Sequence, residues 1–125
     1  MALATASLGA SAAEMTISLS GDQEVPTVTT MASGTAEFRV DDDMSLSGTV
    51  MTEGVEATAA HIHAGASGEN GPVVVPLTKR GDNQWIVPAD TILTEEQMEE
   101  LEAGDMYVNV HSAAHGGGEI RGQLE

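Results

Sequence analysis

Cysteine is absent from the 125-residue chain, and basic residues are scarce. Without cysteine the chain can form neither a disulfide nor a thiolate metal site, so any transition-metal site must use histidine, methionine or carboxylate. Only 4 Lys and Arg stand against 20 Asp and Glu, which gives a formal net charge of −16. Nucleic acid and anionic membranes are therefore poor partners, because binding them requires Lys and Arg to neutralise their charge. Cations are the natural counterparts.

Long apolar runs are also missing, and aromatic residues are few. The longest apolar stretch is far shorter than the roughly 20 residues that a membrane-spanning helix needs, so we expect no membrane insertion. One Phe, one Trp and one Tyr leave a core built from Ala, Val, Leu, Ile and Met. A chain of this length fits a single domain with one modest, aliphatic core.

The first thirteen residues differ in composition from the rest. Residues 1–13, MALATASLGASAA, are small and apolar and end in Ala-Ser-Ala-Ala just before Glu14. This pattern resembles the end of a secretory signal and its cleavage site, although no basic segment precedes it. We interpret residues 1–13 as a leader and residues 14–125 as the folded domain, in a periplasmic or secreted location. A remnant unrelated to secretion is the alternative, and it leaves the compartment open.

The remainder of the chain alternates apolar and polar residues in short segments separated by Gly- and Asp-rich turns. This period of two predicts an all-β fold, a small antiparallel β-sandwich or Greek-key-like barrel of about eight strands. The predicted strands are 16–20, 34–40, 45–52, 57–64, 73–77, 84–87, 106–112 and 119–124.

One segment departs from the β pattern. In TILTEEQMEELEAG, Thr94 is a good N-cap, Gln97 completes a capping box and Gly104 supplies a C-terminal stop. These signals predict one short helix at about 94–103.

The four histidines form two clusters. His61 and His63 make a His-Ile-His triplet within AAHIHAG. Alternate residues of a strand point to the same face about 6.5 to 7 Å apart, so both imidazoles can converge on one ion. His111 lies in YVNVHS, opposite the apolar face of its strand, and His115 follows in the next loop. If the two strands lie close together, all four histidines can reach one centre; surface or hydrogen-bonded histidines are the structural alternative.

The ligand types indicate which metal such a site would hold. Three or four imidazoles without thiolate suit copper, zinc or nickel, and Cu(II) binds nitrogen donors most tightly among the divalent ions. We therefore expect copper, as Cu(I) or Cu(II), with zinc as the second choice. Calcium requires oxygen ligands at a loop spacing that residues 41–43, Asp-Asp-Asp, do not provide, so we interpret this run as a solvated turn.

Catalytic motifs of the common hydrolase and nucleotide-binding types are missing, so we expect a binding protein rather than an enzyme, without excluding redox activity. Glu119 and Arg121 share one face of the last predicted strand. We interpret them as a structural ion pair rather than as catalytic residues.

Several of these segments closely resemble the CHRD domain, which is named after chordin. They are AAHIHAGASGENGPVVVPL, LTEEQMEELEAGDMYVNVHSAAHGGGEIRGQL, SGDQEVP and SGTAEF, and together they span about Met15 to Leu124. The resemblance implies an extracellular or periplasmic β-sandwich, in agreement with the leader. It does not define an activity, because the signalling role of the animal protein does not transfer to an isolated domain.

The His-x-His strand also looks like the copper-binding strand of copper-zinc superoxide dismutases. That likeness concerns three residues, and a likeness of folds does not establish a function. The dismutase pattern further needs a bridging histidine and zinc ligands in a long loop. Here the loop at 65–71 contains Glu69 but no histidine, so we do not expect a dinuclear site.

The leading hypothesis is an exported protein that sequesters, stores or carries copper through His61, His63 and His111, with His115 as a fourth ligand or gate. A protein partner for copper delivery and a two-fold homodimer are both compatible with this hypothesis. One alternative is a metal-free extracellular module that binds other proteins. A second alternative is a mononuclear copper enzyme with dismutase-like redox activity.

Overall fold

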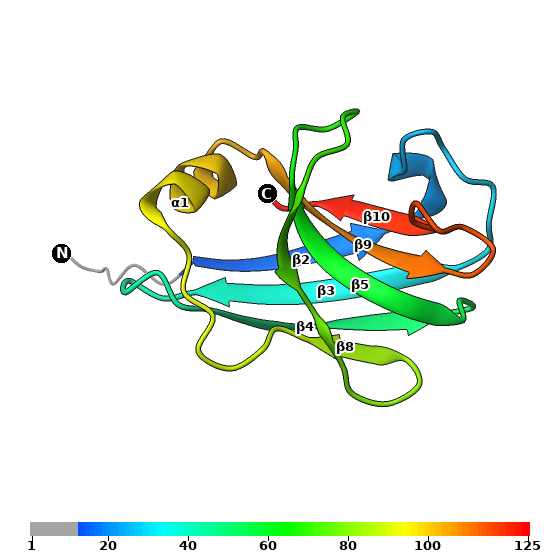
Figure 1. Cartoon of the computed structure of the whole chain (residues 1–125), viewed down its shortest axis with the longest axis horizontal. Helices are drawn as coiled ribbons and strands as arrows, with labels where there is room; N and C mark the ends of the chain where they lie inside the picture. Colours follow the sequence, from blue (N-terminus) through cyan, green and yellow to red (C-terminus); the bar gives the residue numbers. More distant parts are fainter. Residues whose placement is uncertain (1–12) are drawn as a thin grey trace, which may run out of the picture.

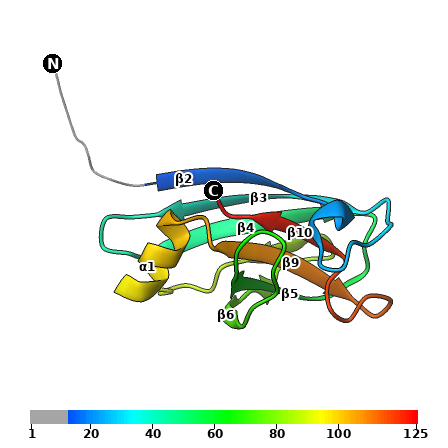
Figure 2. The same cartoon turned by 90° about the horizontal axis from the view of Figure 1, so that it is seen from above.

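Short strands with alternating apolar side chains build two antiparallel sheets in the computed structural model, which describes residues 13–125 (Figure 1). The strands are β2 (Ala13–Leu19), β3 (Ser33–Val40), β4 (Leu46–Glu53), β5 (Ala57–Ala64), β6 (Val73–Pro76), β7 (Thr78–Lys79), β8 (Gln84–Ile86), β9 (Met106–Ser112) and β10 (Ile120–Gln123). One sheet has the order β2-β3-β4-β8-β7 and the other the order β10-β9-β5-β6. The two sheets lie face to face as layers (Figure 2).

This arrangement confirms the predicted all-β sandwich. Each of the eight predicted strands has a counterpart, and the short edge strand β7 was not predicted. Strand β2 begins at Ala13, the last residue of the predicted leader, and Ala13 pairs with Val40 of β3. The rest of the predicted leader, residues 1–12, lies outside the described residues.

The core fills the space between the two sheets. Ile62 of β5 is 1% exposed, and Val108 and Val110 of β9 are fully buried. Because side chains alternate along a strand, the residues between these apolar positions point to the opposite face of the four-stranded sheet. The histidines of β5 and β9 therefore lie on the outer face of that sheet.

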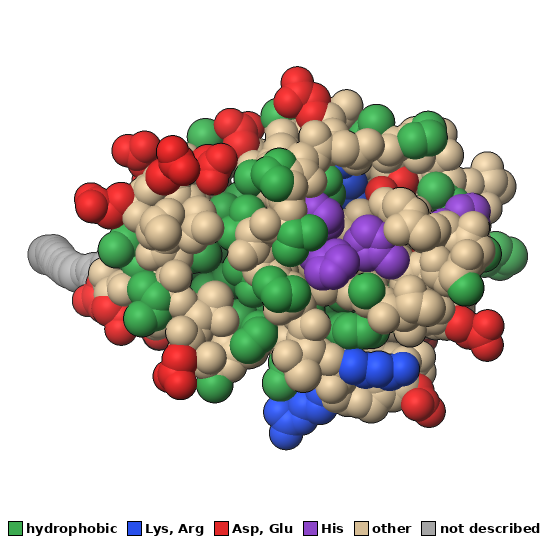
Figure 3. Space-filling model, in the orientation of Figure 1, with side chains coloured by type: hydrophobic (Ala, Val, Ile, Leu, Met, Phe, Trp, Pro, Cys, Tyr) green, Lys and Arg blue, Asp and Glu red, His purple; other side chains and the backbone are tan. Residues whose placement is uncertain are grey.

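Helix α1 (Glu95–Glu102) lies at one end of the sandwich and is one residue shorter at each end than predicted. The backbone N–H of Gln97 donates to Thr94 Oγ1 at 3.1 Å, and the Thr94 N–H donates to Gln97 Oε1 at 2.9 Å, which confirms the capping box. Five of its eight residues are Glu, and acidic side chains gather over this end of the molecule (Figure 3). Among residues 13–125 no helix has both the length and the apolar character to cross a bilayer.

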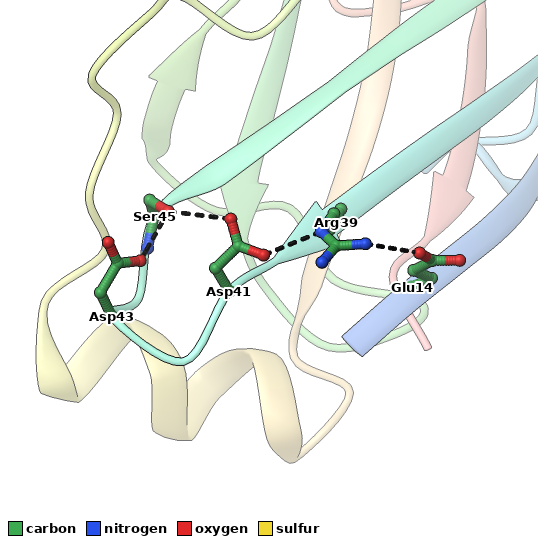
Figure 4. A network of polar contacts seen from close by, with 5 residues as sticks. All are labelled: Glu14, Arg39, Asp41, Asp43 and Ser45. Atoms are coloured by element: carbon green, nitrogen blue, oxygen red, sulfur yellow. Dashed lines mark hydrogen bonds and ion pairs between the residues drawn. The ribbon is translucent and has the colours of Figure 1, made fainter. Parts of the chain in front are cut away.

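The acidic run at 41–43 forms a hydrogen-bonded turn between β3 and β4 (Figure 4). Arg39 donates to Glu14 and to Asp41, each at 2.8 Å, and the backbone N–H of Ser45 donates to Asp43 at 3.0 Å. Exposed ion pairs of this kind contribute at most about 1 kcal/mol each. The geometry agrees with a solvated turn rather than with an ion site.

Candidate metal centre

Three of the four histidines converge on the outer face of the four-stranded sheet. Strands β5 and β9 are antiparallel neighbours, and their register places His111 opposite Ala59, two pairs along from the pair that contains His61. One ring nitrogen from each of His61, His63 and His111 lies within 4.8 Å of the other two. Figure 3 shows histidine side chains gathered at one place on this face. The sequence prediction that the two histidine strands lie close together is confirmed for these three residues.

Backbone carbonyls determine which ring nitrogen of two histidines carries the proton. His63 Nδ1 lies 3.0 Å from the carbonyl of Gly71, and His111 Nδ1 lies 3.0 Å from the carbonyl of Gly116. A carbonyl can only accept, so each ring must carry its proton on Nδ1. The Nε2 atom of each ring is then unprotonated and can act as an acceptor or a metal ligand. This is how metal-binding histidines are commonly oriented, with the second nitrogen donating to a backbone carbonyl.

The lone pairs in this cluster have few partners within the protein. His63 Nε2 is buried and has no hydrogen-bond partner, an arrangement that normally costs about 1–3 kcal/mol. His61 Nδ1 lies 3.1 Å from His111 Nε2. Two ligands of one ion with bonds of about 2.0–2.1 Å lie about 3.3–3.6 Å apart. Small side-chain rotations would therefore bring all three nitrogens onto one metal ion, and the neutral imidazoles fit copper or zinc.

Burial favours the neutral form of the two β5 imidazoles. It lowers the pKa of His61 below 6.5, and the neighbouring His111 and His63 lower it further. Burial also lowers the pKa of His63, against the hydrogen bond to Gly71 and the nearby Asn109 amide. A neutral imidazole is the form that binds a metal, so protons compete less at this cluster than at an exposed histidine.

His115 does not belong to the cluster of three. Strand β9 ends at Ser112, and the chain then turns back toward β10. The backbone N–H of His115 donates to Ser112 Oγ at 3.1 Å within this turn. Because the strand has ended, the fourth residue after His111 no longer shares its face. The His115 side chain instead lines a groove of about 470 Å³ together with Glu24.

Sequence reasoning missed that the outer face of this sheet is largely buried. Tyr107 and Arg121 are each 1% exposed and Asn109 is 2% exposed. The Tyr107 ring stacks on His63 with centroids 4.8 Å apart, and Arg121 Cζ lies 3.4 Å from the Tyr107 ring centroid. Tyr107 Oη also accepts from the Gly71 N–H at 3.0 Å. The Tyr107 ring of β9 and the loop at Gly71 therefore hold His63, the second histidine of β5, in place.

The predicted ion pair between Glu119 and Arg121 is wrong. Arg121 Nη2 donates to the Ala66 carbonyl at 3.0 Å and to Gln123 Oε1 at 3.2 Å. Glu119 instead accepts hydrogen bonds from Thr30 Oγ1 at 2.6 Å and from Ser112 Oγ at 2.7 Å. The guanidinium is directed toward the tyrosine ring and the loop carbonyls, away from Glu119, because those groups enclose it on the outer face of the sheet.

Sequence reasoning also missed Glu24. This carboxyl is 3% exposed, and its Oε2 atom has no hydrogen-bond partner. Burial raises its pKa from 4.5 to about 7, although the charge of Arg121 and the nearby Asn109 amide oppose the rise. One glutamate among 20 acidic residues carries no pattern that would single it out. Only the packing of its loop distinguishes it.

The fold and the cluster define a small, two-layer antiparallel β-sandwich with a candidate three-histidine metal site on the outer face of one sheet. The sequence model of the CHRD domain matches residues 15–124, so the chain belongs to the CHRD domain family. This confirms the resemblance seen in the sequence. CHRD domains occur in extracellular proteins. Comparison with curated proteins and with solved structures found no match to this chain.

Proposed function

We propose that this protein binds copper through His61, His63 and His111 and thereby sequesters or carries it. The observation that supports this most directly is the convergence of three ring nitrogens within 4.8 Å on one sheet face. The carbonyls of Gly71 and Gly116 hold two of the rings with Nε2 unprotonated, as a metal ligand must be.

The donor set favours copper over zinc. All three ligands are neutral imidazoles, and Cu(II) exceeds zinc in affinity for nitrogen donors. Structural zinc sites are usually closed by four protein ligands, whereas this cluster offers three. The net charge of −16 also raises the local concentration of cations around the domain and speeds their capture.

The proposed location is periplasmic or secreted. Two observations support it: CHRD domains occur in extracellular proteins, and residues 1–13 end in the Ala-Ser-Ala-Ala pattern of a cleavage site. An export signal would be demonstrated by recovery of the protein outside the cytoplasm together with loss of its first residues.

The test is a metal titration of the full chain. Metal-free protein is titrated with Cu(II), and separately with Cu(I) under reductant, against a chromophoric chelator of known affinity. The double variant His61→Ala/His63→Ala tests the site, and His115→Ala is the matched control, because His115 lies outside the cluster. We expect one copper ion per chain in the intact protein and in the control, and none in the double variant.

Two results would overturn the proposal. Stoichiometric copper in the double variant would place the site elsewhere, and no copper in the intact chain would remove it. The second result would favour the alternative of a metal-free module that binds other proteins through its sheet or loops. Retention of partner binding after all four histidines are changed to Ala would support that alternative.

A redox activity is a second candidate, because three protein ligands leave a coordination position open, as they do at catalytic metal sites. His61 and His111 are both partly exposed, so a small molecule can approach the cluster from solvent. The test is stopped-flow decay of superoxide with the copper-loaded protein. Decay no faster than with buffer alone would remove this candidate.

A further inference from the structure

Glu24 is a buried carboxyl close to the metal centre that the proposed function does not use. It follows the short 3-10 helix η1 (Gly21–Gln23), in the loop that leads to β3. Two surface grooves meet at this residue. Arg121 lines one groove, of about 420 Å³, and His115 lines the other, of about 470 Å³. The carboxyl is therefore buried but lies within reach of solvent protons.

Asn109 connects this carboxyl to the histidine cluster. Four buried side-chain polar atoms in residues 13–125 lack a hydrogen-bond partner, and three of them are Glu24 Oε2, Asn109 Oδ1 and His63 Nε2. The Asn109 amide lies near both of the other groups and acts on the pKa of each, lowering that of Glu24 and raising that of His63. In the strand register Asn109 also stands directly opposite His61.

Gly118 permits the close approach of Glu24 and Asn109. Its φ is +122°, and a Cβ at this position would collide with Glu24 Oε2 and with Asn109 Nδ2. The carboxylate and the amide therefore face each other across the bare Cα of Gly118. A side chain here would separate Glu24 from the sheet that carries the metal ligands.

The charged groups around Glu24 come from each element that packs against it. Arg121 of β10 is the nearest positive charge and favours the carboxylate. His115 of the β9–β10 turn lines one groove, and Asp22 of η1 lines the other. His63 of β5 lies beyond Asn109. Burial outweighs these influences in the metal-free protein and raises the pKa of Glu24 to about 7.

We propose that Glu24 takes up one proton when copper held by the three histidines is reduced from Cu(II) to Cu(I). An external one-electron donor, such as ascorbate, supplies the electron to the metal, and solvent supplies the proton to the carboxylate. The products are Cu(I) and a neutral carboxylic acid, and no bond between Glu24 and copper forms or breaks. This inference rests on the proposed copper-binding function.

The physical cause is the charge of the metal. A nearby positive charge favours the ionised form of a carboxyl, so bound Cu(II) lowers the pKa of Glu24. Reduction removes one positive charge and lets that pKa rise again. Glu24 therefore has one pKa with Cu(II) bound and a higher pKa with Cu(I) bound. Between these two values the equilibrium constant for reduction changes by at most about tenfold per pH unit, which corresponds to a change of 59 mV in the one-electron reduction potential.

The experiment measures the reduction potential of the copper-loaded full chain from about pH 6.5, where we expect the metal to stay bound, to about pH 8.5. This range includes the Glu24 pKa of about 7. In the wild type we expect the potential to fall as pH rises. In Glu24→Gln we expect a much smaller slope, with potentials closest to those of the wild type at the acid end and clearly higher at the alkaline end. Asp22→Asn is the matched control, because this exposed carboxylate lies in η1, two residues before Glu24. His115→Ala separates any contribution from that imidazole.

The outcomes distinguish this inference from the proposed function. Failure of the wild type to load copper removes the proposed function and this inference with it. Copper loading with equal slopes in the wild type and Glu24→Gln overturns this inference alone. If Glu24→Gln does not fold, infrared difference spectra of the copper-loaded wild type, reduced minus oxidised, test the proton uptake directly. A carboxylic acid carbonyl band must appear on reduction, and its absence overturns the inference.

Discussion

The buried carboxyl of Glu24 makes a prediction about stability that does not involve a metal. Its pKa is raised by burial from 4.5 to about 7. Each pH unit between these values is worth about 1.4 kcal/mol, so ionised Glu24 destabilises the fold by up to roughly 3 kcal/mol. Opening of the loop to water relieves part of this cost. We therefore expect Glu24→Gln to stabilise the metal-free protein by about 1–3 kcal/mol above neutral pH.

The raised pKa of Glu24 also predicts how the stability difference between Glu24→Gln and the wild type changes with pH. Below pH 4.5 the carboxyl is neutral in the folded and the unfolded chain, so the wild type and the glutamine variant differ little in stability. Between 4.5 and about 7 the unfolded chain ionises while the folded chain does not, so the wild type loses stability as pH rises. The difference between variant and wild type must grow through this range and then level off.

Urea unfolding followed by fluorescence provides the assay. Trp85 is the single tryptophan of the chain and is 5% exposed, so its emission reports the folded core. Asp22→Asn controls for the loss of one negative charge close to Glu24 in the chain, and we expect its effect to be small and independent of pH. A Glu24→Gln difference that stays constant from about pH 4.5 to about pH 8.5 would refute the reasoning, as would destabilisation at the alkaline end.

Three further predictions concern the centre and the core. Gly71→Ala should weaken copper binding about 10–100-fold, because its Cβ would collide with the backbone of β5 and displace the carbonyl that orients a metal ligand. Ser67→Ala in the same loop should leave the affinity unchanged. Equal copper affinities of the wild type, Gly71→Ala and Ser67→Ala in chelator competition would contradict the prediction for Gly71. The pKa values of both β5 histidines lie below 6.5, so copper should stay bound at pH 6.5 and be released at lower pH; metal counts that fall above pH 6.5 would argue against it. Ile62→Ala should lower the free energy of unfolding by about 2–5 kcal/mol in urea, and a loss below about 1 kcal/mol would mean that this site is not tightly packed.

Much of the fold was predictable because its signals are local. Alternation along AAHIHA placed Ile62 in the core and its two neighbouring histidines on the opposite face, as the structure shows. The capping box of Thr94 and Gln97 likewise depends on a spacing of three residues. The edge strand β7 was missed because Thr78–Lys79 is too short to show a period.

The site was predictable only in part. His61 and His63 share a face because of the strand period alone, and His111 joined them because β9 is the antiparallel neighbour of β5. His115 was grouped with them by its closeness to His111 in sequence. The turn after Ser112 carries it away from the face, and nothing in the pattern of residues indicates that direction.

The sequence by itself determined the alternation, the turns, the helix caps and the pair of histidines on β5, because each depends on residues a few positions apart. Only the tertiary structure decided that Tyr107, Asn109 and Arg121 are buried on the outer face and that Glu24 lies beside them. Their environment is made by loops distant in sequence that fold over the sheet. Burial and the pKa shifts that follow from it arise from that packing, so no local pattern could report them.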